Sequence, residues 1–135
     1  MKLVLDTDVV VAAVRSPAGA SAELLRAAGT GKCQIIVSVS LALEYESVLT
    51  RSEHIAASSL NASEIGDFLD ALVAIAEPAN IHFRYRPVTR DPADEQVVEA
   101  AVNGQATAIV TFNRRDFGIG PSRVGIGCWL PREAL

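Results

Sequence analysis

The sequence is poor in cysteine and in basic residues, which argues against disulfide-stabilised folds, cysteine metal sites and basic nucleic-acid binders. Its two cysteines, Cys33 and Cys128, lack metal-site spacing and do not form a disulfide framework, so we expect two reduced thiols. Acidic residues outnumber basic ones by 16 to 12, which excludes a globally basic nucleic-acid binder but leaves a local basic face open. Apart from Lys2 and Lys32, all the basic side chains are arginines.

The apolar segment near the N-terminus is too short to enter a membrane. Asp6 and Asp8 interrupt it, and only residues 9–14 are uncharged before Arg15. Neither the apolar region of a signal peptide nor a membrane span fits this length. We therefore expect a soluble, cytoplasmic protein with no membrane partner.

Strand-like and helix-like segments alternate along the chain of 135 residues, half of which are apolar. Apolar runs predict strands at residues 2–5, 34–37, 81–85, 106–111 and 124–130. Helical spacing predicts helices over residues 9–14 and 21–28, from residue 38 or 40 to about 49, from residue 61 or 63 to 77, and from residue 91 to 104, with a loop at 112–120. This order predicts a single α/β domain, residues 1–135, with a mainly parallel central sheet flanked by helices.

Acidic residues recur where these strands end. Asp6 closes the first strand, Glu44 lies on the helix after the second, and Asp94 begins the helix that leads into the strand at 106–111. Asn113 and Asp116 follow that strand. Because functional groups collect at the carboxyl ends of parallel strands, we expect these side chains to lie together.

Such a cluster suits a divalent cation. Buried carboxylates lose solvation and repel one another, and a cation relieves both effects. Oxygen ligands without His or Cys favour Mg²⁺ or Mn²⁺. Each residue alone also fits a structural role: Asp6 as a turn residue, Glu44 as a solvated helix residue, Asp94 as a helix cap, and Asp116 as a loop acid.

Several segments resemble PIN-domain nucleases, and closely the VapC-like toxins of toxin–antitoxin pairs. The matching segments are LVLDTDVVVAAV, IIVSVSLALEYESVL and RDPADEQVVEAAVNGQATAIVTFNRRDF. The closing VGIGCWLPREAL resembles the last strand and short terminal helix of that family. The third segment is the most specific, and together the segments cover essentially the whole chain.

The resemblance assigns the acids to a catalytic metal site. It matches Asp6, Glu44 and Asp94 to the first three acidic positions, while Glu46 points about 200° away from Glu44 around its helix. The fourth position falls in TFNRRDF, where we favour Asp116 as the charged member and Asn113 as a supporting ligand, although the two can exchange roles. Thr111 and Ser38 are expected to orient ligands or backbone, with plain helix capping as the alternative for Ser38.

One position departs from the family pattern. The family commonly has Asn two residues after the first acid, where this chain has Asp8. An acid there strengthens metal binding, caps the following helix, or marks an altered site. We favour the capping interpretation.

The resemblance implies a Mg²⁺- or Mn²⁺-dependent endoribonuclease that cleaves single-stranded RNA, or structured RNA, by metal-activated water. It also implies a homodimer or a higher homo-oligomer, and a cognate antitoxin protein that occupies the acidic groove. The apolar stripe of residues 65–73 serves either such a dimer or the core. Phosphate contacts are expected from five arginines that flank the acids and that are otherwise ordinary surface residues: Arg84, Arg86, Arg90, Arg114 and Arg115. Because only 5% of residues are aromatic, base stacking contributes little.

Two other functions remain alternatives. Asp6 and Asp8 fit the Asp-x-Asp pattern of haloacid-dehalogenase phosphatases, but Lys32 is the only downstream lysine and Thr111 comes after Asp94, against the required order. The second alternative is a catalytically weak PIN fold that acts as a binding module, which Asp8 keeps open.

Overall fold

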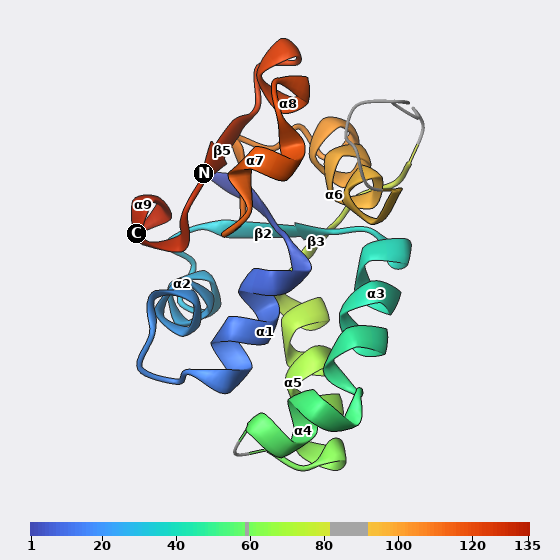
Figure 1. The fold of residues 1–135 in the computed structure, drawn as a ribbon. Coiled ribbons are helices and arrows are strands. Elements are labelled where there is room, and N and C mark those ends of the chain that lie inside the picture. The colour runs from blue at the N-terminus through green and yellow to red at the C-terminus, as the bar shows by residue number, and fades with distance from the viewer. Residues whose placement is uncertain (59, 82–91) are drawn as a thin grey trace.

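A parallel sheet forms the centre of the protein. The computed structural model describes residues 1–58, 60–81 and 92–135. Their five strands are β1 (Lys2–Leu5), β2 (Gln34–Val37), β3 (Glu77–Pro78), β4 (Ala108–Val110) and β5 (Gly127–Trp129), in the order β3-β2-β1-β4-β5 (Figure 1). All four neighbouring pairs are parallel, which confirms the predicted fold class.

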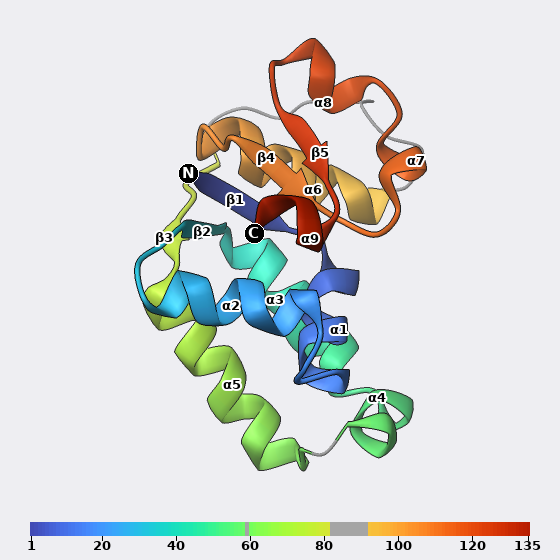
Figure 2. The same ribbon diagram turned by 90° about the vertical axis from the view of Figure 1, so that its left-hand side faces the viewer.

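Helices cover both faces of this sheet. They are α1 (Thr7–Arg15), α2 (Ala20–Gly29), α3 (Val39–Leu49), α4 (Ser52–Ala57), α5 (Ala62–Ile75), α6 (Pro92–Asn103), α7 (Arg114–Phe117), α8 (Gly120–Arg123) and α9 (Pro131–Ala134). Figures 1 and 2 both place α1, α2 and α5 on one side of the sheet and α6 on the other. Within the apolar stripe of α5, Ile65, Leu69 and Leu72 are buried in the core, whereas Phe68 is half-buried and Val73 is exposed.

Local hydrogen bonds explain where the longer helices begin. The Ser38 hydroxyl accepts a hydrogen bond from the N–H of Leu41 at 3.2 Å and so caps α3. Asn61 and Glu64 form a reciprocal capping box at the start of α5. The sequence left residue 38 or 40 as the start of α3 and residue 61 or 63 as the start of α5, and in both helices the earlier residue is the cap.

The predicted elements differ from the structure at several short segments. Residues 77–78, expected at the end of a helix, form β3, where a proline is tolerated because it lies in an edge strand. The expected loop at 112–120 contains α7, and α4 was not predicted. Elements of one or two turns show too few residues for a periodic pattern. The strand expected at 81–85 lies outside the described residues except for Ile81, which is not in a strand.

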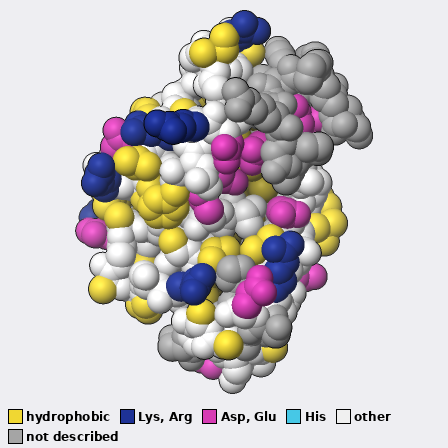
Figure 3. Space-filling view, viewed as in Figure 1, with side chains coloured by type: hydrophobic (Ala, Val, Ile, Leu, Met, Phe, Trp, Pro, Cys, Tyr) yellow, Lys and Arg dark blue, Asp and Glu magenta, His cyan; other side chains and the backbone are white. Residues whose placement is uncertain are grey.

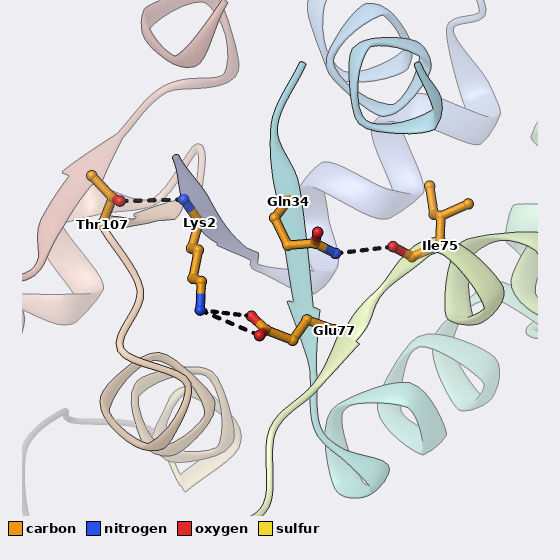
Figure 4. A network of polar contacts seen from close by, with 5 residues as sticks. All are labelled: Lys2, Gln34, Ile75, Glu77 and Thr107. Atoms are coloured by element: carbon orange, nitrogen blue, oxygen red, sulfur yellow. Dashed lines mark hydrogen bonds and ion pairs between the residues drawn. The ribbon is translucent and has the colours of Figure 1, made fainter. Parts of the chain in front are cut away.

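Polar contacts join the strands near their amino-terminal ends (Figure 4). The Lys2 ammonium reaches the two carboxylate oxygens of Glu77 at 3.2 and 3.1 Å, and the Lys2 N–H donates to the Thr107 hydroxyl at 3.2 Å. The Gln34 side chain donates to the Ile75 carbonyl at 3.1 Å. Exposed ion pairs of this kind contribute little to stability, so we attribute most of the stability of the sheet to its apolar core.

Neither cysteine pairs with the other. Cys33 is buried, Cys128 is half-buried, and both thiols are free, as expected. Burial raises the pKa of both, to about 11 for Cys128, which disfavours the reactive thiolate. Separately, no helix within the described part of the chain has the length and apolar character to cross a membrane.

A buried tyrosine connects the core to the end of the central strand. Tyr45 on α3 is fully buried, and its hydroxyl donates a hydrogen bond of 2.5 Å to the carbonyl oxygen of Leu5, the last residue of β1. Burial, and then the negative charge of Asp6, raise the pKa of Tyr45 well above its ordinary value, so the hydroxyl remains a donor. This bond fixes α3 relative to the residue that precedes Asp6.

We expect Tyr45→Phe to lower the free energy of unfolding by about 1.5 kcal/mol, because it leaves a buried carbonyl without its donor. Urea unfolding followed by circular dichroism, in EDTA, measures this change. Ser47→Ala on the exposed face of the same helix is the control and should stay within about 0.5 kcal/mol of the parent. Equal stability of Tyr45→Phe and the parent would show that the bond contributes nothing.

Candidate functional site

Asp6 is the buried carboxylate at the centre of the candidate site, and it is 8% exposed. It follows β1 and caps α1, where its Oδ1 accepts a hydrogen bond from the Thr7 N–H at 2.8 Å. Its Oδ2 accepts one from the Thr111 hydroxyl at 2.7 Å. The expectation that Asp8 caps this helix is therefore wrong: Asp6 has the extended backbone of a cap, while Asp8 lies inside the first turn.

Asp8 lies in the same site, close enough to Asp6 for their charges to interact. Its Oδ2 accepts hydrogen bonds from the N–H of Phe112 at 3.1 Å and from the side-chain amide of Asn113 at 3.0 Å. Its Oδ1 is buried without a hydrogen-bond partner among the described residues. Burial first, and the charge of Asp6 second, raise the pKa of Asp8 to about 7. The protein thus opposes ionisation of Asp8, an effect that a bound cation reverses.

The segment after β4 holds these two carboxylates in place. Thr111 is fully buried, and besides donating to Asp6 its hydroxyl accepts the N–H of Asn113 at 2.9 Å. The N–H of Asp6 in turn donates to the Val110 carbonyl at 2.9 Å. Thr111 therefore orients both a candidate ligand and the backbone, as its position in the sequence suggested.

Glu44 and Asp94 lie on two helices that contact each other. Glu44 is half-buried on α3, and Glu46 on the same helix is exposed. Asp94 is half-buried in the first turn of α6, which begins at Pro92, so Asp94 is not the cap. Helix α3 contacts both α1 and α6, and α6 also contacts β1. The structure thus gathers the elements that carry Asp6, Glu44 and Asp94.

The same grouping is visible on the molecular surface. Figure 3 shows acidic side chains gathered in the middle of one face, around the beginnings of α1, α3 and α6. Basic side chains lie on the same face, at some distance from this acidic centre. Further acidic side chains lie among the basic ones toward the edges of this face.

The two candidates for the fourth position differ in their contacts. Asn113 is bonded to Asp8 through its amide, whereas Asp116 is exposed on α7. The side chain of Asp116 makes no hydrogen bond or ion pair with any described residue. The structure therefore connects Asn113 to the acidic cluster directly but does not connect Asp116 to it.

Two of the five candidate phosphate-binding arginines can be placed. Arg114 and Arg115 are exposed on α7, and Arg114 forms an ion pair of 3.1 Å with Glu133. The other three, Arg84, Arg86 and Arg90, lie outside the described residues. Arg114 and Arg115 thus place positive charge on α7, directly after Asn113 in the chain.

Two buried acids on α6 were not identified from the sequence. Glu95 and Glu99 are buried, and neither is without a partner. Their separation of four residues places both on one face of the helix, a signal that the sequence did contain. Helix α6 therefore carries two buried acids in addition to Asp94.

The donor chemistry of the site fits a hard divalent cation. Within the described ranges, no three His, Cys, Asp or Glu side chains are placed closely enough to hold a metal ion together. The groups that do meet are oxygen donors, and one of them, Asp8 Oδ1, is a buried oxygen without a hydrogen-bond partner among the described residues. Such donors favour Mg²⁺ or Mn²⁺ over metals that prefer nitrogen or sulfur.

Comparison with known proteins identifies similar sequences and folds. A family model described as PIN domain matches residues 2–115. A crystal structure of VapBC2 from Rickettsia felis, bound to a DNA fragment from their promoter, contains a chain of similar fold, with a TM-score of 0.65 and 17% identity over 95% of this chain and 97% of that chain. At this identity the likeness shows the fold alone. No curated protein matches the sequence significantly.

We expect Thr111→Val to lower the free energy of unfolding by about 2 kcal/mol, because it removes the buried hydroxyl that bonds Asp6 and Asn113. Thr107→Val is a matched control at the other end of β4, where the hydroxyl is exposed, and should cost less than about 0.5 kcal/mol. Denaturant unfolding in EDTA compares the two. Equal losses of unfolding free energy in the two variants would show that the hydrogen bonds of the buried Thr111 hydroxyl do not stabilise the protein more than those of the exposed Thr107 hydroxyl.

Proposed function

Because the chain belongs to the PIN domain family, we propose that it is a metal-dependent endoribonuclease. The observation that carries the proposal is the buried carboxylate of Asp6, held at the end of the central strand among elements that bear Glu44 and Asp94. Its substrate is single-stranded RNA or an unpaired part of a structured RNA. The match to the PIN family removes support for the haloacid-dehalogenase alternative.

Asp6, Glu44 and Asp94 would hold the cation, with Asn113 or Asp116 at the fourth position. Bound Mg²⁺ or Mn²⁺ would activate a water molecule and stabilise the displacement at phosphorus. The chain itself supplies orientation: Thr111 fixes one oxygen of Asp6, and the Thr7 N–H fixes the other. Tyr45 fixes the strand end from which Asp6 projects.

Basic residues near this centre would bind the phosphates of the RNA. Arg114 and Arg115 are exposed on α7, one and two residues after Asn113. We extend the same assignment to Arg84, Arg86 and Arg90, whose positions in the chain flank the acids. A bound cation reverses the local negative potential, so an acidic protein can accept RNA at this point.

We also propose that the protein is the toxin of a toxin–antitoxin pair, acting in the cytoplasm as a homodimer. The likeness in fold to a chain of the VapBC2 complex supports this assignment. A cognate antitoxin protein would then occupy the acidic groove and block RNA. A gene for a small DNA-binding protein immediately upstream would be the expected genomic arrangement.

We expect the purified protein to cleave a mixed panel of single-stranded RNAs in Mg²⁺ or Mn²⁺ and not in EDTA. Asp6→Asn and Asp94→Asn should each lower the rate at least about a hundredfold, because each removes a charge that holds the cation. Glu46→Gln is the matched control, since Glu46 lies on the helix of Glu44 but is exposed. Gel analysis of cleavage, with circular dichroism to confirm folding, makes the measurement.

Three other outcomes would count against this proposal. Cleavage that persists in both Asp variants would identify a contaminating nuclease. Loss of activity in Glu46→Gln to the same degree would show that the acids act only through general charge. No cleavage together with no metal binding would favour the binding-module alternative.

The arginines of α7 make a separate prediction for RNA affinity. Arg115→Ala should weaken binding of a single-stranded RNA about equally for different sequences, and should reduce the slope of log affinity against log salt by about 0.7. Binding is measured in Ca²⁺ or with Asp6→Asn to prevent cleavage. Arg132→Ala on α9 is the control, and an equal effect there would show that Arg115 has no specific contact.

A further inference from the structure

Asp8 differs from the other acids of the site in how its two oxygens are used. One oxygen accepts two hydrogen bonds, and the other is buried without a partner among the described residues. From this contact pattern we propose that Asp8, in place of Asp116, supplies the fourth carboxylate of the metal site. This inference rests on the proposed function, since it assigns a ligand to the same cation.

The hydrogen bonds of Asp8 hold its carboxylate in one orientation. The Phe112 N–H and the Asn113 amide both donate to Oδ2, at 3.1 and 3.0 Å, and both come from the segment after β4. The other oxygen, Oδ1, is buried and has no donor among the described residues, and the Asp8 carboxylate lies close enough to Asp6 for their charges to interact. A buried carboxylate oxygen without a donor is unfavourable, and a hard cation is the ligand that satisfies it.

The identity of residue 113 agrees with this assignment. Its side chain meets Asp8 within hydrogen-bond distance, so an acid at both positions would place two negative charges in contact. The Asn113 amide instead donates a hydrogen bond to Asp8, so that only Asp8 of this pair can carry a negative charge.

Asp116 lacks comparable contacts. It is exposed in the four-residue helix α7, and its side chain bonds to no described residue. Both acids therefore have an oxygen without a donor among the described residues, but only that of Asp8 is buried, where a cation would replace the missing donor.

Metal affinity distinguishes these two acids. Isothermal titration of the full chain with Mn²⁺ should show a Kd at least about tenfold higher for Asp8→Asn, and within twofold of the parent for Asp116→Asn. The melting temperature in EDTA is the second measurement. Asp8→Asn is nearly isosteric and removes repulsion with Asp6, so it should melt no lower than the parent without metal, and Mn²⁺ should raise its melting temperature less.

Asp6→Asn, titrated in parallel, separates failure of this inference from failure of the proposed function. If Asp6→Asn loses Mn²⁺ affinity and Asp8→Asn keeps it, only the assignment of Asp8 is overturned. If Asp6→Asn binds Mn²⁺ as the parent does, the metal site of the proposed function is overturned as well. An equal loss of Mn²⁺ affinity in Asp116→Asn also overturns the assignment. A lower melting temperature of Asp8→Asn in EDTA overturns it too, because that result identifies Asp8 as a structural residue of the helix.

Discussion

The hydrogen bonds of the Asp6 carboxylate are the constraint on which the geometry of the site depends. One oxygen bonds to the first turn of α1 and the other to Thr111 beyond β4. A single side chain therefore fixes where the helix begins and how close the segment after β4 lies to it. That segment in turn positions Asn113 and Asp8. This part of the site is thus built by a chain of short contacts between the start of α1 and the segment after β4.

The apolar core holds in place the strand from which Asp6 projects. Leu3, Val4 and Leu5 are completely buried in the central strand, and Tyr45 bonds the last of them to α3. Because Glu44 precedes Tyr45 on the same helix, the tyrosine that fixes the strand end also limits the movement of Glu44. Packing and site geometry are thus coupled through one buried hydroxyl, which explains why a polar atom is retained deep in the core.

Much of the fold follows from the sequence because its strong signals are local. The strands at residues 2–5 and 34–37 are apolar runs bounded by polar residues, and the structure forms them over the same ranges. The carboxyl ends of parallel strands share one edge of a sheet, so the gathering of the elements that carry Asp6, Glu44 and Asp94 was also predictable. Short elements such as α7 and β3 were not, because a few residues show no period.

The contacts within the site could not be predicted in the same way. Asp8 and Asn113 are separated by 105 positions in the chain, and no local pattern indicates that an acid and an amide this far apart will meet. The choice between capping and metal binding at Asp8 also depends on geometry, because Asp6 already supplies the cap. Although Asp6 occupies that position, the hydrogen bonds of Asp8 Oδ2 run to the segment after β4 and not to the start of the helix. The position of Asp8 is therefore set by contacts between distant segments, at a point that the fold keeps partly from water.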